Sequence, residues 1–343
     1  MAKTIGRRVP AGLLAVVLLA GVLGVYLWRS GPGRGREDVV IRGFAMDTVV
    51  AIRVPAGHEP AARQALAELN RLERIFDRHD PASEVARVNA GAGDWVAVGP
   101  EVMEVLALVE DMAAVTGGLF DVTVGPLLEL WGFGGETARV PGPAELARAL
   151  DLVGGRLVEL DRAGGRVRLA RQGMVIDLGG VAKGYAIDRA ARVLRDRGVD
   201  YGLVEVGGDI YLFGGRSGDR PWRVGVEHPR HGGEMLGRIH LWEGAVATSG
   251  DYQRFFMEGG ERYHHILDPR TGRPGRQAQL ATVVGPSVAE VDILSTALFL
   301  MGPEWGLEVL EGLPGIEGII VDKDGGVRVS SGLRDRPEPF FED

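Results

Sequence analysis

The chain has 343 residues, which is enough for one large domain or two smaller ones, and 45% of them are hydrophobic. This composition excludes a disordered protein. The absence of cysteine excludes disulfides, zinc–thiolate and iron–sulfur sites, a cysteine nucleophile and an N-terminal lipid-modified cysteine. The net charge is −8, although residues 1–36 carry six basic and no acidic side chains. The body that follows is therefore strongly acidic, which argues against binding to nucleic acid.

The N-terminal segment from Val9 to Trp28 contains twenty residues without a charge, the length that spans one hydrocarbon core. Basic residues stand on both sides, so their distribution sets no clear orientation. We expect residues 1–30 to form an uncleaved membrane anchor, with a cleavable signal segment as the alternative. Residues 31–38 are predicted to be a linker, and residues 39–335 are predicted to form a folded body outside the cytoplasm.

The spacing of apolar residues predicts the elements of the body. Helices are expected at residues 60–76, 100–116, 143–152, 182–197, 288–301 and 305–313. Strands are expected at residues 39–54 (interrupted near 44–48), 157–160, 166–170, 175–177, 201–213, 222–226, 238–242 and 263–267, with a final hairpin around Asp322. Residues 247–252 are predicted to be a polar turn. Because the helices cluster rather than alternate strictly with strands, the predicted fold class is α+β.

The segment 177–188 begins as a predicted strand, turns at two glycines and continues as a helix. Such a turn exposes backbone amides at the helix N-terminus, where a phosphate group can bind. Lys183 would add positive charge beside a pyrophosphate, and Asp177 would accept hydrogen bonds from a ligand. The alternative is an ordinary strand-to-helix connection with a solvated lysine.

Asp292 and Thr296 stand four residues apart in the apolar helix predicted for residues 288–301. Their oxygens therefore fall on one face of the helix. A carboxylate and a hydroxyl together suit a hard cation such as Mg²⁺, which fills its other positions with water or phosphate oxygens. The alternative is a threonine bonded to its own helix, with the aspartate near the N-cap.

Two adjacent histidines, His264 and His265, end a predicted strand just before the turn at residues 268–272. Neighbouring side chains on a strand face opposite sides, so we expect at most one of them to point into a given pocket. A histidine titrates near neutral pH and can act as a general base. The alternative for each histidine is a structural role.

Residues 117–126 and the run 127–133 combine glycine turns with aromatic side chains. Such a surface suits a flat ring, and its alternative is packing in the core. The chain contains neither a G-x-G-x-x-G sequence nor a P-loop, which argues against a Rossmann dehydrogenase and a P-loop kinase.

In this order, these segments resemble the ApbE family of FAD:protein FMN transferases. The resemblance rests on Met46-Asp-Thr, Ser83, Asn89, Gly118–Phe133, Asp177–Asp188, Val206-Gly-Gly-Asp209, Thr248-Ser-Gly-Asp-Tyr252, His265-Ile-Leu-Asp-Pro-Arg-Thr-Gly272 and Asp292–Thr296. It implies a T-fold-like arrangement of mixed sheets with packed helices. It also implies a magnesium-dependent enzyme that cleaves FAD, attaches the FMN moiety to a threonine hydroxyl of a partner protein and releases AMP.

Several residue roles are implied only by this resemblance. His265 would activate the acceptor hydroxyl, and Lys183 would act at the pyrophosphate. Magnesium would be held by Asp292 and Thr296, with backbone oxygens of Gly180 and Ser295. Contacts to FAD are implied for Met46, His79, Leu119, Phe120, Asp121, Asp177, Lys183 and Ile266. His79 stands where the family often has an aromatic ring, and Asp47 where many members have glycine.

The resemblance further implies an extracytoplasmic enzyme, which agrees with an inner-membrane anchor and a periplasmic body. The expected acceptor is a flavin-carrying subunit of a membrane redox complex, such as the sodium-pumping NADH:quinone oxidoreductase. Two other functions stay open, namely hydrolysis of FAD to FMN and AMP at the same site, and non-enzymatic flavin binding. A general base such as His265 disfavours the second, because storage needs no base.

Overall fold

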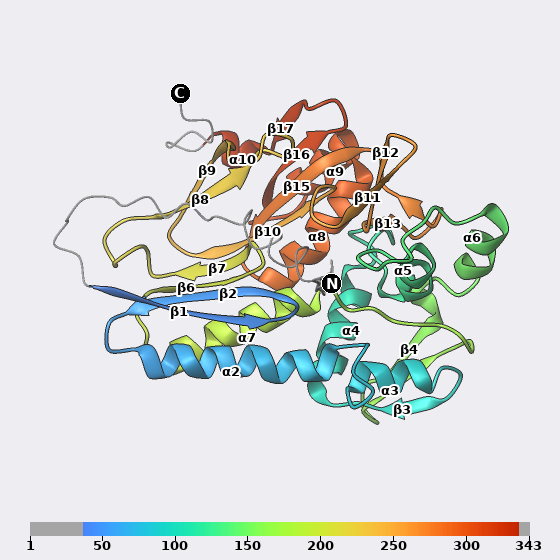
Figure 1. Cartoon of the computed structure of the whole chain (residues 1–343). Coiled ribbons are helices and arrows are strands. Elements are labelled where there is room, and N and C mark those ends of the chain that lie inside the picture. The colour runs from blue at the N-terminus through green and yellow to red at the C-terminus, as the bar shows by residue number, and fades with distance from the viewer. Residues whose placement is uncertain (1–36, 336–343) are drawn as a thin grey trace, which may run out of the picture.

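The computed structural model of the chain describes residues 37–335 (Figure 1). The predicted anchor and most of the predicted linker lie outside these residues. Between residues 37 and 335, no helix is both long and apolar enough to cross a membrane.

The centre of the structure is an eight-stranded sheet in the order β1-β2-β6-β7-β10-β15-β16-β17, in which every neighbouring pair is antiparallel. Its strands are β1 (Asp38–Ala45), β2 (Thr48–Pro55), β6 (Gly202–Val206), β7 (Asp209–Phe213), β10 (Gly244–Gly250), β15 (Ala278–Gly285), β16 (Glu317–Asp322) and β17 (Val327–Val329). The smaller sheets contain β3 (Trp95–Ala97), β4 (Val158–Asp161), β5 (Arg166–Leu169), β8 (Trp222–Glu227), β9 (Met235–Leu241), β11 (Phe255–Glu258), β12 (Glu261–His264), β13 (Leu267–Asp268) and β14 (Arg273–Pro274).

The helices are α2 (Glu59–Phe76), α3 (Glu84–Ala90), α4 (Pro100–Met112), α5 (Gly125–Trp131), α6 (Pro143–Leu150), α7 (Ala182–Asp196), α8 (Val288–Met301), α9 (Pro303–Glu311) and α10 (Ser331–Arg334). Helices and strands are therefore segregated rather than regularly alternating, and the predicted α+β class is confirmed.

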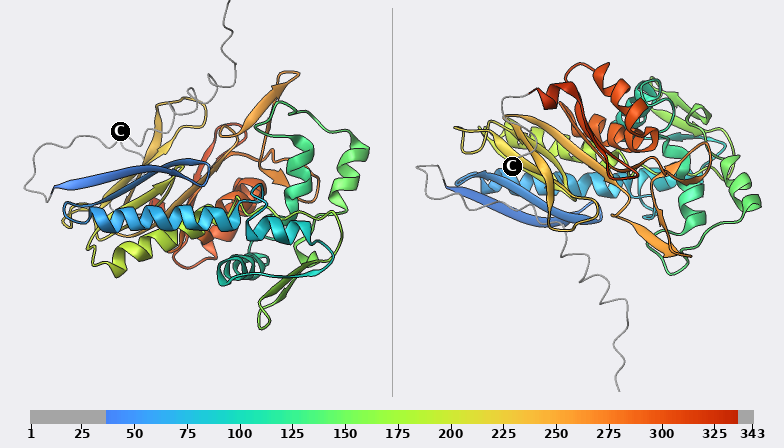
Figure 2. Two further views of the ribbon diagram at one scale, coloured as in Figure 1. Left: turned by 60° about the horizontal axis from the view of Figure 1, so that its bottom comes forward. Right: turned by 90° about the horizontal axis from the view of Figure 1, so that it is seen from above.

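The two faces of the central sheet bury different cores, because side chains alternate along each strand. On β6, Val204 packs in a core with α2, α7 and α8, whereas Leu203 packs in a second core beneath β8 and β9. In Figures 1 and 2, α2 and α7 run side by side along the first face, and α8 continues across it under β10 and β15. The sheet is thus a layer between helices on one side and a two-stranded ribbon on the other.

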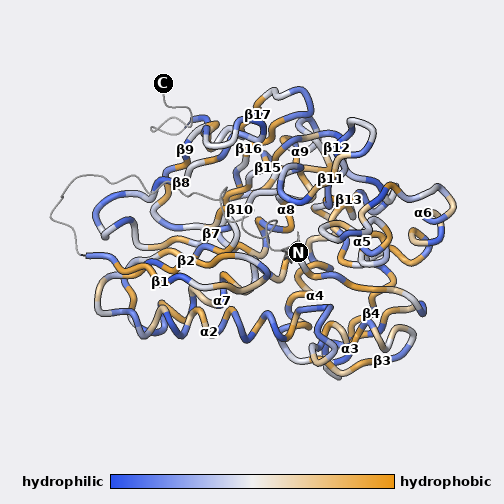
Figure 3. The backbone as a smooth tube through the Cα atoms, viewed as in Figure 1, coloured by the Kyte–Doolittle hydropathy of each residue, from blue (hydrophilic) through white to orange (hydrophobic). Residues whose placement is uncertain are grey.

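Two helices show how the hydropathy pattern of the sequence matches the burial of their side chains. Helix α8 is buried almost throughout and matches the predicted span, with Ser287 as its N-cap and Gly302 at its end. Helix α2 instead buries one stripe, which ends in Leu69, Leu72 and Phe76. In Figure 3 its tube therefore changes repeatedly between hydrophilic and hydrophobic colours.

Two predicted elements are wrong, and side-chain contacts explain both. Residues 175–177 form no strand, because the side chain of Asn89 bonds both the N–H and the C=O of Ile176 at 2.7 and 3.0 Å, in place of a neighbouring strand. Residues 247–250 belong to strand β10 rather than to a turn, since their small side chains fit against α8. The predicted interruption of the strand at 39–54 is confirmed by the turn between β1 and β2, whereas the predicted strands at 201–213 and 263–267 are each divided into two shorter ones.

A third apolar cluster joins α5 and α6 to the hairpin β11–β12. The ring of Trp131 is fully buried, and its Nε1 donates to the carbonyl of Gly272 at 2.8 Å. Phe133, Phe256 and Tyr263 surround it with ring centroids 5.6 to 6.3 Å away. The run at residues 127–133 is therefore core packing at Trp131, the alternative that the sequence left open.

Helices α7 and α8 touch at a glycine. A Cβ atom at Gly184 would lie 2.6 Å from the carbonyl oxygen of Val288, which is too close for any side chain. One turn further along α7, Asp188 accepts hydrogen bonds from the N–H groups of Val288 and Ala289 at 2.9 and 3.0 Å. Its second oxygen also accepts from the hydroxyl of Ser287, so α7 caps the N-terminus of α8.

We expect Gly184→Ala to destabilise the protein by ~1–3 kcal/mol, because the added methyl group separates the helices, although alanine favours a helix by itself. The measurement is the free energy of unfolding in urea. Gly232→Ala is the matched control, since no atom lies within 4 Å of its added Cβ. Equal stability of the Gly184 and Gly232 variants would show that the helices can separate without cost.

Candidate active site

The candidate active site is centred on Lys183, in the first turn of α7. Its ammonium group forms an ion pair with Asp209 at the start of β7, and its Nζ lies 3.7 Å from Oδ2 of Asp292 on α8. Asp209 is 2% exposed and Asp292 is 5% exposed. Lys183 is therefore not a solvated lysine, and one ammonium group stands between two buried carboxylates.

The carboxylate of Asp292 is incompletely satisfied. Its Oδ2 is buried without a hydrogen-bond partner, and burial raises the pKa of this carboxyl group while Lys183 opposes the rise. Nearby, the hydroxyl of Ser249 on β10 lies 2.8 Å from that of Ser295 and 3.1 Å from that of Thr296. A buried carboxylate oxygen that lacks a hydrogen bond, with three hydroxyl groups nearby, is chemically suited to a hard cation.

The predicted metal residues are close together. A Cβ atom at Gly180 would lie 4.0 Å from the Thr296 hydroxyl and 2.9 Å from the ring of Phe120, so only glycine fits this turn. Ser295, rather than Thr296, bonds to its own helix, through the carbonyl of Asp292 at 2.9 Å. Throughout residues 37–335, no three His, Cys, Asp or Glu side chains are grouped to hold a metal. A cation here would depend on one carboxylate with hydroxyl and backbone oxygens, a donor set that fits Mg²⁺.

The carboxylates of Asp177 and Asp121, both predicted to contact FAD, make hydrogen bonds within the protein. Asp177 accepts from the N–H of Gly179 at 2.7 Å and pairs with Nε of Arg78 at 2.7 Å. Asp121 accepts from Thr123 and from the N–H of Gly155 at 2.8 Å. These bonds fix the two loops that lead into α5 and α7.

The other predicted FAD contacts fall into two groups. Leu119, Phe120 and Ile266 are buried, and Phe120 lies against Gly180. Met46 and His79 stand on separate turns, Met46 between β1 and β2 with φ of 55°, and His79 exposed between α2 and α3. The structure thus brings Phe120 beside Gly180, near the Thr296 hydroxyl. Among the described residues, no hydrogen bond or ion pair is seen that joins Met46 or His79 to Lys183, Asp209 or Asp292.

The two histidines have different surroundings. His264 is buried, with Nε2 2.8 Å from the carbonyl of Gly275, and its ring meets Phe299 edge-on. His265 is only partly buried, and its Nδ1 lies 3.3 Å from the carbonyl of Arg254. If Nδ1 donates to this carbonyl, Nε2 carries the lone pair that can accept a proton. Burial, with the nearby charge of Arg254, lowers the pKa of His265 to about 3, so the ring is neutral at neutral pH.

Sequence reasoning gave no role to four residues at this site. Asp209 and Ser249 lie in two of the motifs, but their partners Lys183 and Thr296 come from distant elements. Arg78 is partly buried and pairs with Asp177 and Glu129 at 2.7 and 2.9 Å. Arg254 is an exposed cation beside His265. The only local sign was a carboxylate or hydroxyl placed directly after a glycine turn or inside an apolar strand.

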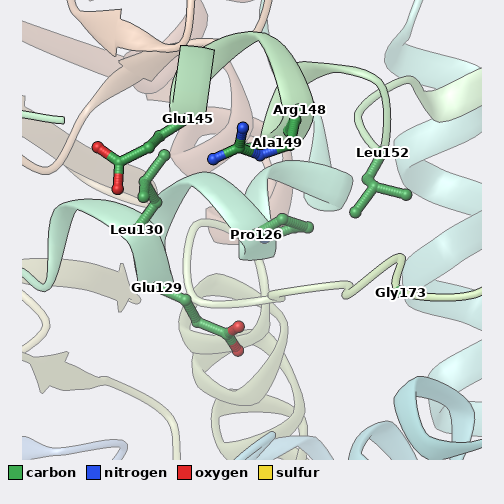
Figure 4. Close-up of a pocket in the computed structure, with 8 residues that line it drawn as sticks. All are labelled: Pro126, Glu129, Leu130, Glu145, Arg148, Ala149, Leu152 and Gly173. Carbon is green, nitrogen blue, oxygen red and sulfur yellow. The ribbon is translucent and has the colours of Figure 1, made fainter. Parts of the chain in front are cut away.

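Two cavities are found away from Lys183. One of about 480 Å³ lies between α5 and α6, and Figure 4 shows Glu129, Glu145 and Arg148 among the residues that line it. A second, of about 320 Å³, lies behind the hairpin β11–β12 and has His264 in its wall. Neither is lined by Lys183, Asp292 or His265.

Comparison with known proteins shows the family of this chain. Residues 46–320 match the ApbE family. The FAD:protein FMN transferases of Treponema pallidum and Klebsiella pneumoniae are 32% and 31% identical, covering 88% and 86% of this chain and 88% and 92% of their own. A crystal structure of an ApbE protein from Thermotoga maritima has a TM-score of 0.82 at 38% identity, covering 87% of this chain and 98% of that one. The apo flavinyl transferase ApbE of Pseudomonas stutzeri has a TM-score of 0.78 at 31% identity, covering 88% and 97%. This chain belongs to the ApbE family.

Proposed function

We propose that this chain is an FAD:protein FMN transferase, which moves the FMN moiety of FAD to a threonine hydroxyl of a partner protein and releases AMP. The relatives that carry this activity in their names match most of the chain and most of their own length. The observation that carries the proposal is Lys183 between two buried carboxylates, beside the hydroxyl groups of Ser249 and Thr296.

In the proposed reaction, the threonine oxygen forms a bond to the phosphorus of the FMN half, and the pyrophosphate bond to AMP breaks. Nε2 of His265 takes the threonine proton, a step that requires the ring to be neutral. Lys183 neutralises charge on the pyrophosphate. Asp209 holds Lys183 in place.

We propose Mg²⁺ as the cofactor, held by Asp292 and Thr296 with backbone oxygens of Gly180 and Ser295. The support is the buried Oδ2 of Asp292, which has no hydrogen-bond partner and only Lys183 as a counter-charge, and the hydroxyl group of Thr296 on the same helix. When bound, Mg²⁺ would supply neutralisation of negative charge on the phosphate oxygens.

Asp292→Asn should lower transfer by about 100-fold or more, since it removes the only carboxylate proposed for the cation. The full-length chain is incubated with FAD, Mg²⁺ and a flavin-carrying subunit as acceptor, and acceptor mass is measured. A gain equal to FMN that EDTA abolishes supports transfer, and free FMN and AMP without a gain in acceptor mass indicate hydrolysis.

Mg²⁺ should also raise the melting temperature of the wild type but not of Asp292→Asn. The exposed Asp111→Asn is the control.

His265→Asn should retain FAD binding, measured by flavin fluorescence, and lose about 10²–10⁴-fold in transfer rate. In the wild type, the lowered pKa keeps the base neutral as pH falls below the ordinary value of 6.5, so transfer should persist in mildly acidic buffer. The matched control is His231→Asn, because His231 is exposed. Full activity of His265→Asn would remove this histidine from the mechanism.

We further propose that residues 1–30 anchor the protein in the inner membrane, with the body in the periplasm and the acceptor in a membrane redox complex. The support is the uncharged segment Val9 to Trp28. In fractionated cells the full-length chain should remain with membranes in high salt and be digested by protease added to spheroplasts. Recovery in the soluble cytoplasmic fraction would contradict the anchor.

A further inference from the structure

The cavity at the hairpin β11–β12 is lined by more cationic than anionic side chains, in a protein whose net charge is negative. Its volume is about 320 Å³, and four cationic side chains line it together with one carboxylate, Asp251. The cations are Arg230, Arg262, Arg276 and Lys323. The net charge of the whole chain is −8, so the positive charge here is local.

Asp251 is already saturated inside this cavity. Arg230 binds it through two bonds of 2.7 Å each, and Arg262 adds a third at 3.1 Å. Arg276 pairs with Glu261, and Lys323 pairs with Asp324. Counted against Asp251, Glu261 and Asp324, the four cations leave an excess of one positive charge, and both Arg276 and Lys323 are exposed.

The same face of the hairpin also exposes apolar side chains. In the hairpin register, Phe255 stands opposite His264, and Met257 stands opposite Arg262. Phe255 is 42% exposed and Met257 is 56% exposed, and the guanidinium of Arg262 lies 4.4 Å from the Phe255 ring centroid. The opposite face, with Phe256 and Tyr263, is covered by Trp131. Only the basic face is therefore open to a partner.

This face is connected to the proposed base. His264 forms part of the cavity wall, and the next residue is His265. Adjacent Cα atoms are only ~3.8 Å apart, so a few extended residues of a bound polypeptide can reach from one to the other. The exposed Arg254 stands beside His265 and extends the cationic surface toward it.

We propose that the basic face of the hairpin β11–β12, with the cavity behind it, is the docking site for an acidic segment of the acceptor protein near its threonine. This inference rests on the proposed transfer function. Carboxylates of the partner would pair with Arg276 and Lys323 at the rim, and an apolar side chain would cover Phe255 and Met257. Charge complementarity of this kind sets partner choice and the rate of encounter.

The probe is a fluorescent synthetic peptide with one central threonine flanked by aspartates, compared with a peptide in which asparagine replaces each aspartate. Anisotropy titration of the full-length chain should show about tenfold tighter binding of the acidic peptide, an advantage that salt reduces. Arg276→Glu and Lys323→Glu should each abolish the advantage. Arg162→Glu is the matched control, because Arg162 is equally exposed on the distant β4–β5 turn.

Two further readings separate this inference from the proposed function. FAD binding should be unchanged in Arg276→Glu and Lys323→Glu, whereas KM for the acceptor subunit should rise without a change in kcat. Equal binding of the two peptides, an equal loss in Arg162→Glu, or loss of FAD binding in the rim variants would overturn the docking site and leave transfer intact. Charge-dependent binding without any transfer from FAD would instead contradict the proposed function alone.

Discussion

The side chain of Asp188 on α7 caps the N-terminus of the neighbouring helix α8, and this partly buried contact sets the distance between the two halves of the site. Burial raises the pKa of this carboxyl group, and three donors on α8 compensate for the loss of water. Gly184, one turn earlier, allows the helices to approach that closely. Lys183 and Asp292 stand on these two helices, so the position of the ammonium group relative to the carboxylate follows from a contact that touches neither.

The charges of Lys183, Asp209 and Asp292 add little to the stability of the fold, which suggests that they are kept for function. Taking two carboxylates and one ammonium group out of water costs free energy that the single ion pair recovers only in part. An apolar cluster of the same size would hold α7, α8 and β7 together at least as well. In the function proposed above, an additional positive charge and a phosphorylated ligand complete this arrangement.

The sequence predicts this fold best where a single local pattern decides the structure. Helix α8 matches its predicted span because nearly every side chain is apolar and Ser287 and Gly302 limit it. The strand predicted at residues 175–177 is wrong because the side chain of Asn89, far away in the sequence, makes the backbone hydrogen bonds that a neighbouring strand would make. For the same reason, Lys183 and Asp292 could be chosen from their local motifs, whereas Asp209 and Ser249 acquire a role only when β7 and β10 are packed against the helices.

The central sheet pairs segments that are far apart in the chain. Val50 on β2 stands opposite Val206 on β6, and β2 has no other neighbour except β1. During synthesis the β1–β2 hairpin is therefore complete long before its partner strand exists, and one of its edges stays unpaired in the meantime. Such high contact order slows folding, because a long loop must close before the pairing contributes any stability. We therefore expect the risk of aggregation to depend on how long that edge stays unpaired, rather than on the stability of the finished sheet.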